Sequence, residues 1–159
     1  MNIDKFLQAQ SVEYDVIPHR ATYDAQRLAQ ELHVTGHEVA KTVLVRCNHG
    51  YQYVVAVLPA DRRIDMEKMS EALGGSELQL ATEVEIAEHC PDCEFGALPP
   101  FGTQYGMQTI VDESLTHDET IVFEGNAHDE AIRMKFADFQ RLEEPLVAPF
   151  TVERRAHAV

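Results

Sequence analysis

The chain has 159 residues, with 13 Lys or Arg against 27 Asp or Glu, which gives a net charge of −14 when histidine is neutral. This length suits one domain, and 45% hydrophobic with 25% charged residues excludes a disordered chain. The acidic balance argues against DNA and against broad nucleic-acid binding, because phosphate contacts need positive charge. No apolar run approaches the roughly 20 residues of a membrane span. No secretion signal opens the chain, so we expect a cytoplasmic protein that does not contact a membrane.

The predicted elements begin with a short helix at residues 3–10 and a strand at residues 11–18. Thr22 can cap a second helix that runs to Leu32 and ends before Gly36. The next segment gives the strongest hairpin signal. Its two β-branched runs, at residues 42–47 and 51–58, are joined by Asn48-His49-Gly50.

Asp65 then caps a helix that Gly74-Gly75 ends, and a short strand follows at residues 77–80. Thr82 and Glu85 fit a capping box that opens a helix ending near Cys90. Glycines and prolines in residues 91–107 exclude a regular element and indicate an ordered loop.

Three strand-like segments follow that loop, and a short helix closes the domain. The strands are expected at residues 108–111, 120–124 and 131–136, and the helix at residues 138–142. Short strands interrupted by helices favour an α+β domain with a mixed sheet over a doubly wound parallel sheet. We expect one domain over residues 1–150 and a frayed tail over residues 151–159.

The cysteines do not form a recognised metal or redox motif. Cys90 and Cys93 make a single C-x-x-C, but the paired spacing of a four-ligand zinc site is absent and Cys47 stands alone. The motif follows a predicted helix, whereas a thioredoxin-like motif opens one. The pattern favours two small residues at a helix-to-loop turn, with a redox or zinc protein as an alternative. We expect no metal and no cofactor.

Two features can support chemistry. Lys41 opens an apolar strand, where its ammonium group can hold a phosphate or a carboxylate; a lysine that only reaches solvent is the alternative. The loop from Gly96 to Gly106 offers backbone N–H groups that can stabilise an oxyanion, and a tight structural turn is the alternative.

These features fall in segments that resemble the YbaK family of prolyl-tRNA-synthetase-associated trans-editing domains. The matching segments, in order, are Ala40-Lys41-Thr42-Val43, Val57-Leu58-Pro59-Ala60-Asp61, Asp92 to Gly102, Gly125-Asn126-Ala127-His128, Ile132-Arg133-Met134 and Asp138-Phe139. The run Gly-Ala-Leu-Pro-Pro-Phe-Gly at residues 96–102 is the most specific of them.

The resemblance implies an aminoacyl-tRNA deacylase that acts in trans and has a curved mixed sheet, partly closed and barrel-like, flanked by helices. By resemblance, Lys41 holds the phosphate near the terminal adenosine. The backbone at Gly96 and Pro100 positions the carbonyl and the attacking water, and His128 lies near the aminoacyl group. It also places substrate contacts at Arg46, Leu98, Pro99, Phe101, Gly102, Gly125 and Asn126.

This chemistry agrees with the absence of a catalytic triad. An aminoacyl ester is already activated, so a positioned water, a stabilised oxyanion and the substrate's own ribose hydroxyl can suffice. The partner is then the acceptor end of a mischarged tRNA, contacted by a few basic residues. Those nearest the motifs are Arg46, Arg62, Arg63, Arg133 and Lys135.

Alternatives remain open at this point. A non-catalytic module could bind an amino acid, a nucleotide or a tRNA end, or could dock on an aminoacyl-tRNA synthetase. For an enzyme, alanine, serine, threonine and cysteine are the candidate amino acids, since editing is needed where a pocket discriminates one small group only weakly. We expect a monomer.

Overall fold

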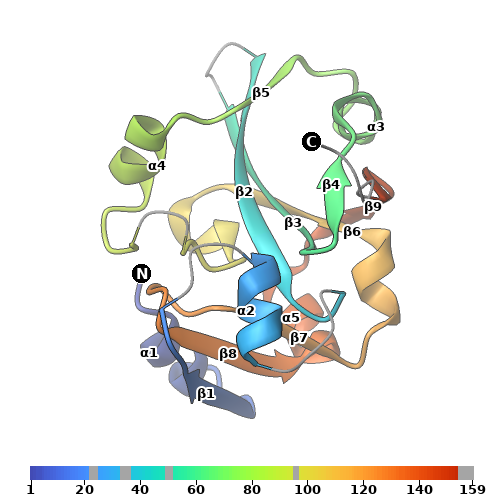
Figure 1. Ribbon diagram of the computed structural model, residues 1–159. Coiled ribbons are helices and arrows are strands. Elements are labelled where there is room, and N and C mark those ends of the chain that lie inside the picture. The colour runs from blue at the N-terminus through green and yellow to red at the C-terminus, as the bar shows by residue number, and fades with distance from the viewer. Residues whose placement is uncertain (22–24, 33–36, 49–51, 95–96, 154–159) are drawn as a thin grey trace.

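The computed structural model describes residues 1–21, 25–32, 37–48, 52–94 and 97–153 (Figure 1). Its helices are α1 (Ile3–Ala9), α2 (Ala25–Glu31), α3 (Met66–Ala72), α4 (Glu83–His89) and α5 (Phe136–Glu143), with short 3-10 helices η2 (Gly102–Tyr105) and η3 (Glu113–His117). Its strands are β1 (Tyr14–Pro18), β2 (Ala40–Cys47), β3 (Gln52–Pro59), β4 (Arg62–Ile64), β5 (Leu78–Leu80), β6 (Gln108–Asp112), β7 (Thr120–Glu124), β8 (Glu130–Lys135), β9 (Leu146–Ala148) and β10 (Thr151–Glu153). The predicted positions Thr22, Gly36, His49, Gly50, Gly96 and 154–159 lie outside the described residues.

Three sheets organise the described chain. A mixed sheet has the order β5-β2-β3-β6-β9, an antiparallel sheet has the order β1-β8-β7, and β10 pairs with β4. The mixed α+β class predicted from the sequence is confirmed. The strand pairing of the described residues gives no closed barrel. No helix in this described part is long and apolar enough to cross a bilayer.

The two larger sheets meet where the chain enters β2. Val39 forms a parallel bridge with Val122 of β7, and the Val122 N–H donates to the Glu38 carbonyl at 3.2 Å. In Figure 1, β2 runs from its pairing with β5 down to this junction with β7. The junction therefore connects the start of β2 to the sheet that contains β7 and β8.

Local signals in the sequence explain several element boundaries. The Asp65 side chain accepts the N–H groups of Glu67 and Lys68 at the start of α3, as predicted. Thr82 and Glu85 form both hydrogen bonds of a capping box on α4. The predicted hairpin of β2 and β3 is also confirmed, with Val43 opposite Ala56 in its register.

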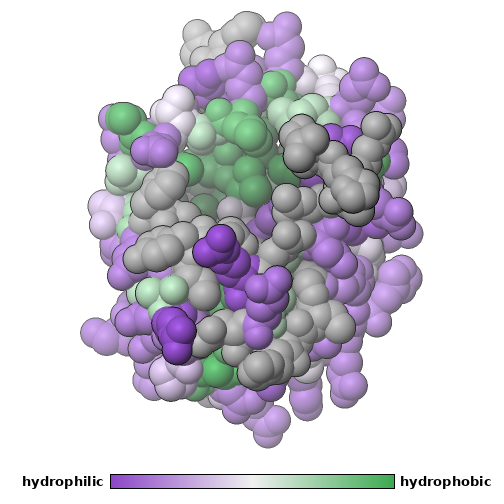
Figure 2. Space-filling model, in the orientation of Figure 1, coloured by the Kyte–Doolittle hydropathy of each residue, from purple (hydrophilic) through white to green (hydrophobic). Residues whose placement is uncertain are grey.

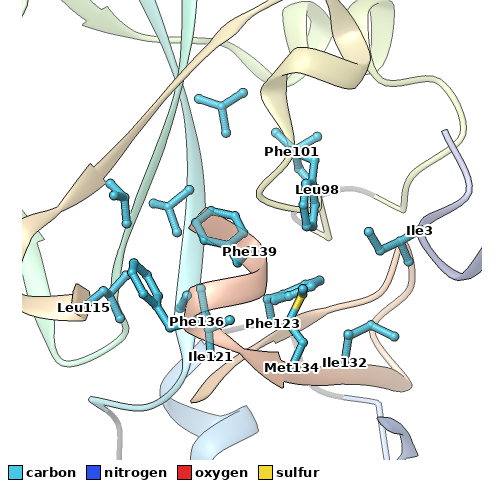
Figure 3. Packing of buried hydrophobic residues seen from close by; sticks show 14 of the residues in the cluster. Ile3, Leu98, Phe101, Leu115, Ile121, Phe123, Ile132, Met134, Phe136 and Phe139 are labelled. Carbon is cyan, nitrogen blue, oxygen red and sulfur yellow. The ribbon is translucent and has the colours of Figure 1, made fainter. Parts of the chain in front are cut away.

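A cluster of aromatic rings connects the loop after residue 96 to the core (Figure 3). Phe101 is fully buried, and its ring meets those of Phe6, Phe123 and Phe139 at centroid distances of 5.3, 5.9 and 5.3 Å. The three contacts have the edge-to-face geometry that aromatic quadrupoles favour. The cluster joins α1, β7 and α5 to the loop.

Glu143 at the end of α5 holds the segment that follows Phe101. One carboxylate oxygen accepts the Thr103 N–H at 3.1 Å and the Thr109 hydroxyl, and the other accepts the Thr103 hydroxyl at 2.5 Å. The Thr109 hydroxyl in turn accepts the Gly102 N–H at 2.9 Å. Burial is the main effect on Glu143 and raises the pKa of its carboxyl group. The loop is thus fixed by a buried acid as well as by Phe101.

The C-terminal part differs from the sequence-based expectation. Thr151–Glu153, expected in a frayed tail, forms β10 and pairs with β4, neither of which was predicted. Phe150 is fully buried, and its N–H donates to the Asp112 carboxylate at 3.0 Å. The contact is long-range, so local patterning gives no sign of it. Phe136, expected at the end of a strand, is instead the first residue of α5.

We expect Phe101→Ala to lower the free energy of unfolding by about 3–5 kcal/mol, because a large aromatic side chain is lost from a closed core. Val84→Ala is the control, since Val84 is 66% exposed, and it should change stability by at most about 0.5 kcal/mol. Urea unfolding followed by circular dichroism measures both. Equal losses in the two variants would contradict the assignment of Phe101 to the core.

Glu143→Gln tests the buried acid through the pH dependence of stability. The pKa of Glu143 in the folded state lies above its ordinary value of 4.5. Protonated Glu143 therefore stabilises the fold fully below pH 4.5, and this stabilisation is lost as the pH rises through the folded-state pKa. Glutamine does not ionise in this range, so wild-type stability relative to Glu143→Gln should fall as pH increases above 4.5. Urea unfolding at several pH values, with the exposed Glu144→Gln as control, measures this. A difference that is independent of pH would refute it.

Candidate active site

Lys41 lies on β2 two residues after the junction with β7. The bridge between Val39 and Val122 is parallel, so Lys41 and Glu124, each two residues farther along, come to the same level. Side chains two residues apart on a strand point to the same face, so those of Lys41 and Glu124 lie on the same face as Val39 and Val122. That face packs against Leu28 and Ala29 of α2. The half-buried Lys41 is therefore brought to the end of β7.

The turn between β7 and β8 contains the next two predicted residues. The Gly125 N–H donates to the Glu130 carbonyl at 3.0 Å, and Asn126 has a φ of 72°, in the left-handed region that asparagine tolerates. A Cβ at Gly125 would lie 3.2 Å from Cγ1 of Ile132, so a larger residue there would require the Ile132 side chain to shift. The turn fixes the path of the chain toward His128.

The Asn126 side chain connects this turn to other segments. Its oxygen accepts the Ile3 N–H at 2.8 Å, and its nitrogen donates to the Met1 carbonyl at 2.8 Å and to the Cys93 sulfur at 3.2 Å. The Asn126 carbonyl accepts the Glu94 N–H at 2.9 Å. All four contacts are internal, so Asn126, predicted to contact substrate, also organises the surroundings of the site.

His128 is buried beside two acidic residues. Its Nδ1 lies 2.9 Å from Oε2 of Glu124, and its backbone N–H donates to the Glu94 carboxylate at 3.0 Å. The His128 and Glu124 side chains are 6% and 11% exposed. The sequence analysis named neither acid. The four-residue spacing of Glu124 and His128 across a Gly-Asn turn is the signal that could have suggested Glu124.

The loop at residues 97–102 is more enclosed than expected. Leu98, Pro99 and Pro100 are buried, and Figure 3 shows Leu98 and Phe101 among the core side chains. A Cβ at Gly102 would lie 2.6 Å from the Thr109 hydroxyl and 2.9 Å from Cγ2 of Val55. Leu98, Phe101 and Gly102, predicted to contact substrate, therefore have packing functions that explain their identities. Gly96 lies outside the described residues.

The backbone N–H groups of this loop are fewer than the sequence suggested. Pro99 and Pro100 have none, and those of Ala97, Phe101 and Gly102 donate to the Glu94 carbonyl, the Pro99 carbonyl and the Thr109 hydroxyl. Within residues 97–102, the Leu98 N–H is the one that donates no hydrogen bond to another described residue. The expectation of several donors is wrong for these described residues, because the fold uses them itself.

Arg46 is separated from the other predicted residues. It lies five residues after Lys41 on β2, so the two side chains leave opposite faces of the strand. Its guanidinium group forms an ion pair with Glu85 of α4 at 3.2 Å and donates to Gln79. The Tyr53 hydroxyl, the largest influence, and the Thr82 backbone lower the pKa of Glu85 to about 2. Arg46 thus joins β2 to α4.

The cysteine pair lies at the helix-to-loop turn predicted for it. Cys90 is the C-cap of α4 and is 1% exposed, and burial raises the pKa of its thiol to about 11. The half-buried Cys93 sulfur is 3.1 Å from the Tyr105 hydroxyl. In the described ranges, no three His, Cys, Asp or Glu side chains are grouped as a metal ion would require.

The structure places Lys41 at the level of Glu124 and Glu124 beside His128, while the loop at residues 97–102 follows Glu94, which accepts the His128 N–H. Lys41 supplies positive charge for a phosphate, and the Leu98 N–H can donate to a carbonyl oxygen. His128 supplies an imidazole ring, a side chain that can donate or accept a hydrogen bond. These groups suit the hydrolysis of an activated ester attached to a phosphate-containing molecule.

Comparison with known proteins agrees with this chemistry. The multifunctional Ser/Thr-tRNA deacylase ProXp-y of Escherichia coli K12 is 26% identical over 147 residues, which cover 91% of this chain and 87% of that protein. The prolyl-tRNA editing protein ProX of Acetoanaerobium sticklandii is 19% identical over 135 residues, 82% of each chain.

Solved structures show the same fold. The crystal structure of a proposed trans-editing enzyme for prolyl-tRNA synthetase has a TM-score of 0.83 at 20% identity and covers 95% of each chain. The family model of the aminoacyl-tRNA editing domain matches residues 19–142, most of the chain. The resemblance seen in the sequence motifs is therefore confirmed, and this protein belongs to the family of aminoacyl-tRNA editing domains.

Proposed function

We propose that this protein is a single-domain aminoacyl-tRNA deacylase that hydrolyses the ester of mischarged tRNA in trans. The observation that supports it best is that the parallel bridge of Val39 with Val122 brings Lys41 of β2 to the level of Glu124, whose carboxylate lies 2.9 Å from His128. Membership of the editing family supplies the reaction class. Mischarged tRNA is a cytoplasmic substrate, so we place the protein in the cytoplasm, as a monomer.

In this proposal Lys41 holds the phosphate next to the terminal adenosine, and the aminoacyl group lies toward His128. The Leu98 N–H, together with the backbone at Gly96, faces the ester carbonyl and stabilises the oxyanion. Pro100 gives the loop a rigid path, and Gly102 fixes its end against Thr109. The neighbouring ribose hydroxyl orients the water. No metal and no cofactor is needed for this reaction.

The substrates that we propose are tRNAs charged with small amino acids. The E. coli relative is named for Ser/Thr-tRNA and the A. sticklandii relative for prolyl-tRNA editing. Serine, threonine, alanine and cysteine are the class that a synthetase pocket rejects weakly, so an editing enzyme is useful there. Serine and threonine are our first choice.

A binding module is the second candidate, and a surface observation favours it. Figure 2 shows an apolar hollow between α4 and α3, and Leu80 and Val84 are 57% and 66% exposed. A cavity of about 610 Å³ lies between α3 and β5 and is lined by Arg46, Ser70 and Leu78 among others. A synthetase that docks on this side would be the partner of such a module.

Deacylation of a tRNA panel separates the two candidates. We expect hydrolysis of seryl- or threonyl-tRNA and a loss of about 10²-fold or more in kcat/KM for Lys41→Ala, because a phosphate contact that orients the ester is removed. Lys68→Ala is the matched control, since Lys68 is exposed on α3. Absence of hydrolysis of alanyl-, seryl-, threonyl-, cysteinyl- and prolyl-tRNA by the folded protein would favour the binding module.

The acidic charge predicts a small footprint on tRNA. With a net charge of −14, contacts confined to the acceptor end limit repulsion from the remaining phosphates. We expect a mischarged acceptor-stem minihelix to be hydrolysed with a kcat/KM within about threefold of the whole tRNA, and expect both rates to fall as salt increases. Dependence on the anticodon arm would contradict this footprint.

A further inference from the structure

We propose that Cys90 and Cys93 form a peroxide-sensitive thiol pair, in which oxidation closes a disulfide that slows deacylation and a dithiol restores the reduced state. The reaction between the two sulfurs depends on the geometry of one turn. Its effect on hydrolysis rests on the proposed deacylase function and adds a regulation of that same site.

The turn after α4 brings the two cysteines within the reach of a disulfide. The Cys93 N–H donates to the Cys90 carbonyl at 3.3 Å, which closes a four-residue turn. The Cα atoms at the ends of such a turn lie less than about 7 Å apart, and disulfides usually join Cα atoms that are about 4.4–6.8 Å apart. Both residues belong to the same hydrophobic cluster, and both are free thiols in this structure. A disulfide can therefore form here with little movement of the backbone.

The two thiols differ in their access to solvent, and this difference gives each one a role. Cys93 is half-buried between exposed neighbours, whereas Cys90 is 1% exposed. A small oxidant therefore reaches the Cys93 sulfur first, since oxidation of a thiol depends on its exposure. Burial raises the pKa of the Cys90 thiol to about 11, and the charge of a Cys93 thiolate adds to this increase. The second contribution ends when Cys93 is oxidised, so Cys90 is then the thiol that attacks the oxidised sulfur.

The reaction balances with hydrogen peroxide as the oxidant. The Cys93 sulfur bonds to one peroxide oxygen, the O–O bond breaks, and the thiol proton passes to the leaving oxygen, which yields a sulfenic acid and water. The Cys90 sulfur then bonds to the Cys93 sulfur, the S–O bond breaks, and the Cys90 proton leaves with that oxygen as a second water. The two sulfurs together lose two electrons, which reduce the peroxide. Dithiothreitol reverses the change by thiol–disulfide exchange.

The Cys93 sulfur has contacts that a disulfide would change. It lies 3.1 Å from the Tyr105 hydroxyl and accepts the Asn126 side-chain N–H at 3.2 Å. The two sulfurs are not bonded in this structure, so the more exposed Cys93 sulfur has to shift toward Cys90 when the bond forms. It also loses the hydrogen that a thiol can donate. Oxidation therefore weakens the connection between this turn and Asn126.

Glu94 connects a shift of Cys93 to the candidate site, because it is the next residue in the chain. Its N–H donates to the Asn126 carbonyl at 2.9 Å, and its carboxylate accepts the His128 backbone N–H at 3.0 Å. Its carbonyl accepts the Ala97 N–H at 3.0 Å at the start of the loop. A shift of Cys93 thus displaces the residue that joins the β7–β8 turn to the loop. Small displacements of groups that orient an ester can lower the rate by a large factor.

The first test follows the thiols in the absence of tRNA. Trypsin cleaves after Lys and Arg, so Cys90 and Cys93 lie in one peptide, residues 69–133, and Cys47 lies in another, residues 47–62. After hydrogen peroxide, we expect the first peptide to lose two hydrogen atoms, to resist alkylation and to regain both thiols with dithiothreitol. The buried Cys47 is the internal control and should stay a free thiol. In Cys90→Ser, the Cys93 sulfenic acid should accumulate and react with dimedone.

The second test measures hydrolysis of seryl- or threonyl-tRNA before and after the same treatment. We expect wild-type kcat/KM to fall at least about fivefold on oxidation and to return with dithiothreitol. Cys93→Ser keeps a small polar side chain, and its activity should not change with peroxide, which separates the disulfide from oxidation of methionine. Cys47→Ser is the matched control and should respond as wild type does.

The proposal would be overturned by peroxide that leaves both thiols free, or that adds oxygen to Cys93 without closing the disulfide. A disulfide that forms while kcat/KM stays unchanged would also overturn it, as would an equal loss of activity in Cys93→Ser. If Cys90→Ser does not fold, wild type and Cys93→Ser decide the question by both measurements. Absence of hydrolysis by untreated wild type would refute the deacylase function and with it the regulation, whereas the peptide masses decide independently whether the disulfide forms.

Discussion

The parallel contact between Val39 and Val122 is the constraint on which the site depends. It attaches the residues at the start of the long β2–β3 hairpin to the antiparallel sheet of β1, β8 and β7. The two sheets therefore share one corner, which is the Val39–Val122 bridge. Lys41 on one side and the Gly-Asn turn on the other lie within two to four residues of this corner. Both bridge residues are fully buried against α2, which protects the contact from water and from local opening.

The loop after residue 96 depends on a second kind of constraint, which is close packing around glycine and aromatic residues. Phe101 fills the core between three other rings, and Gly102 lets the backbone pass where a Cβ would overlap Thr109 and Val55. Glu143 then fixes the following turn by accepting three hydrogen bonds in a buried position. A loop held this firmly can present the Leu98 N–H without reorganisation when a substrate binds, and preorganised donors of this kind stabilise an oxyanion efficiently.

The charge distribution agrees with a small substrate footprint. Several basic residues near the motifs are engaged within the fold: Arg46 with Glu85, and Arg62 with the Thr151 hydroxyl at 2.6 Å. Lys135 lies 4.0 Å from Glu13 at the surface. With 13 Lys or Arg against 27 Asp or Glu, the chain has a negative net charge that opposes contact with a long stretch of tRNA backbone. Recognition of the acceptor end at the corner of β2 and β7 fits an acidic protein, whereas a long groove on RNA does not.

The sequence by itself determined most of the local elements and the family. The caps at Asp65 and Thr82 and the β2–β3 hairpin depend on short-range patterns that one chain displays directly. Tertiary structure alone decided which groups meet. It paired Arg46 with Glu85, used most N–H groups of the loop internally and brought Thr151–Glu153 against β4. These outcomes result from contacts between residues far apart in the chain or from the bending of a turn, and the order of residue types does not encode either one locally.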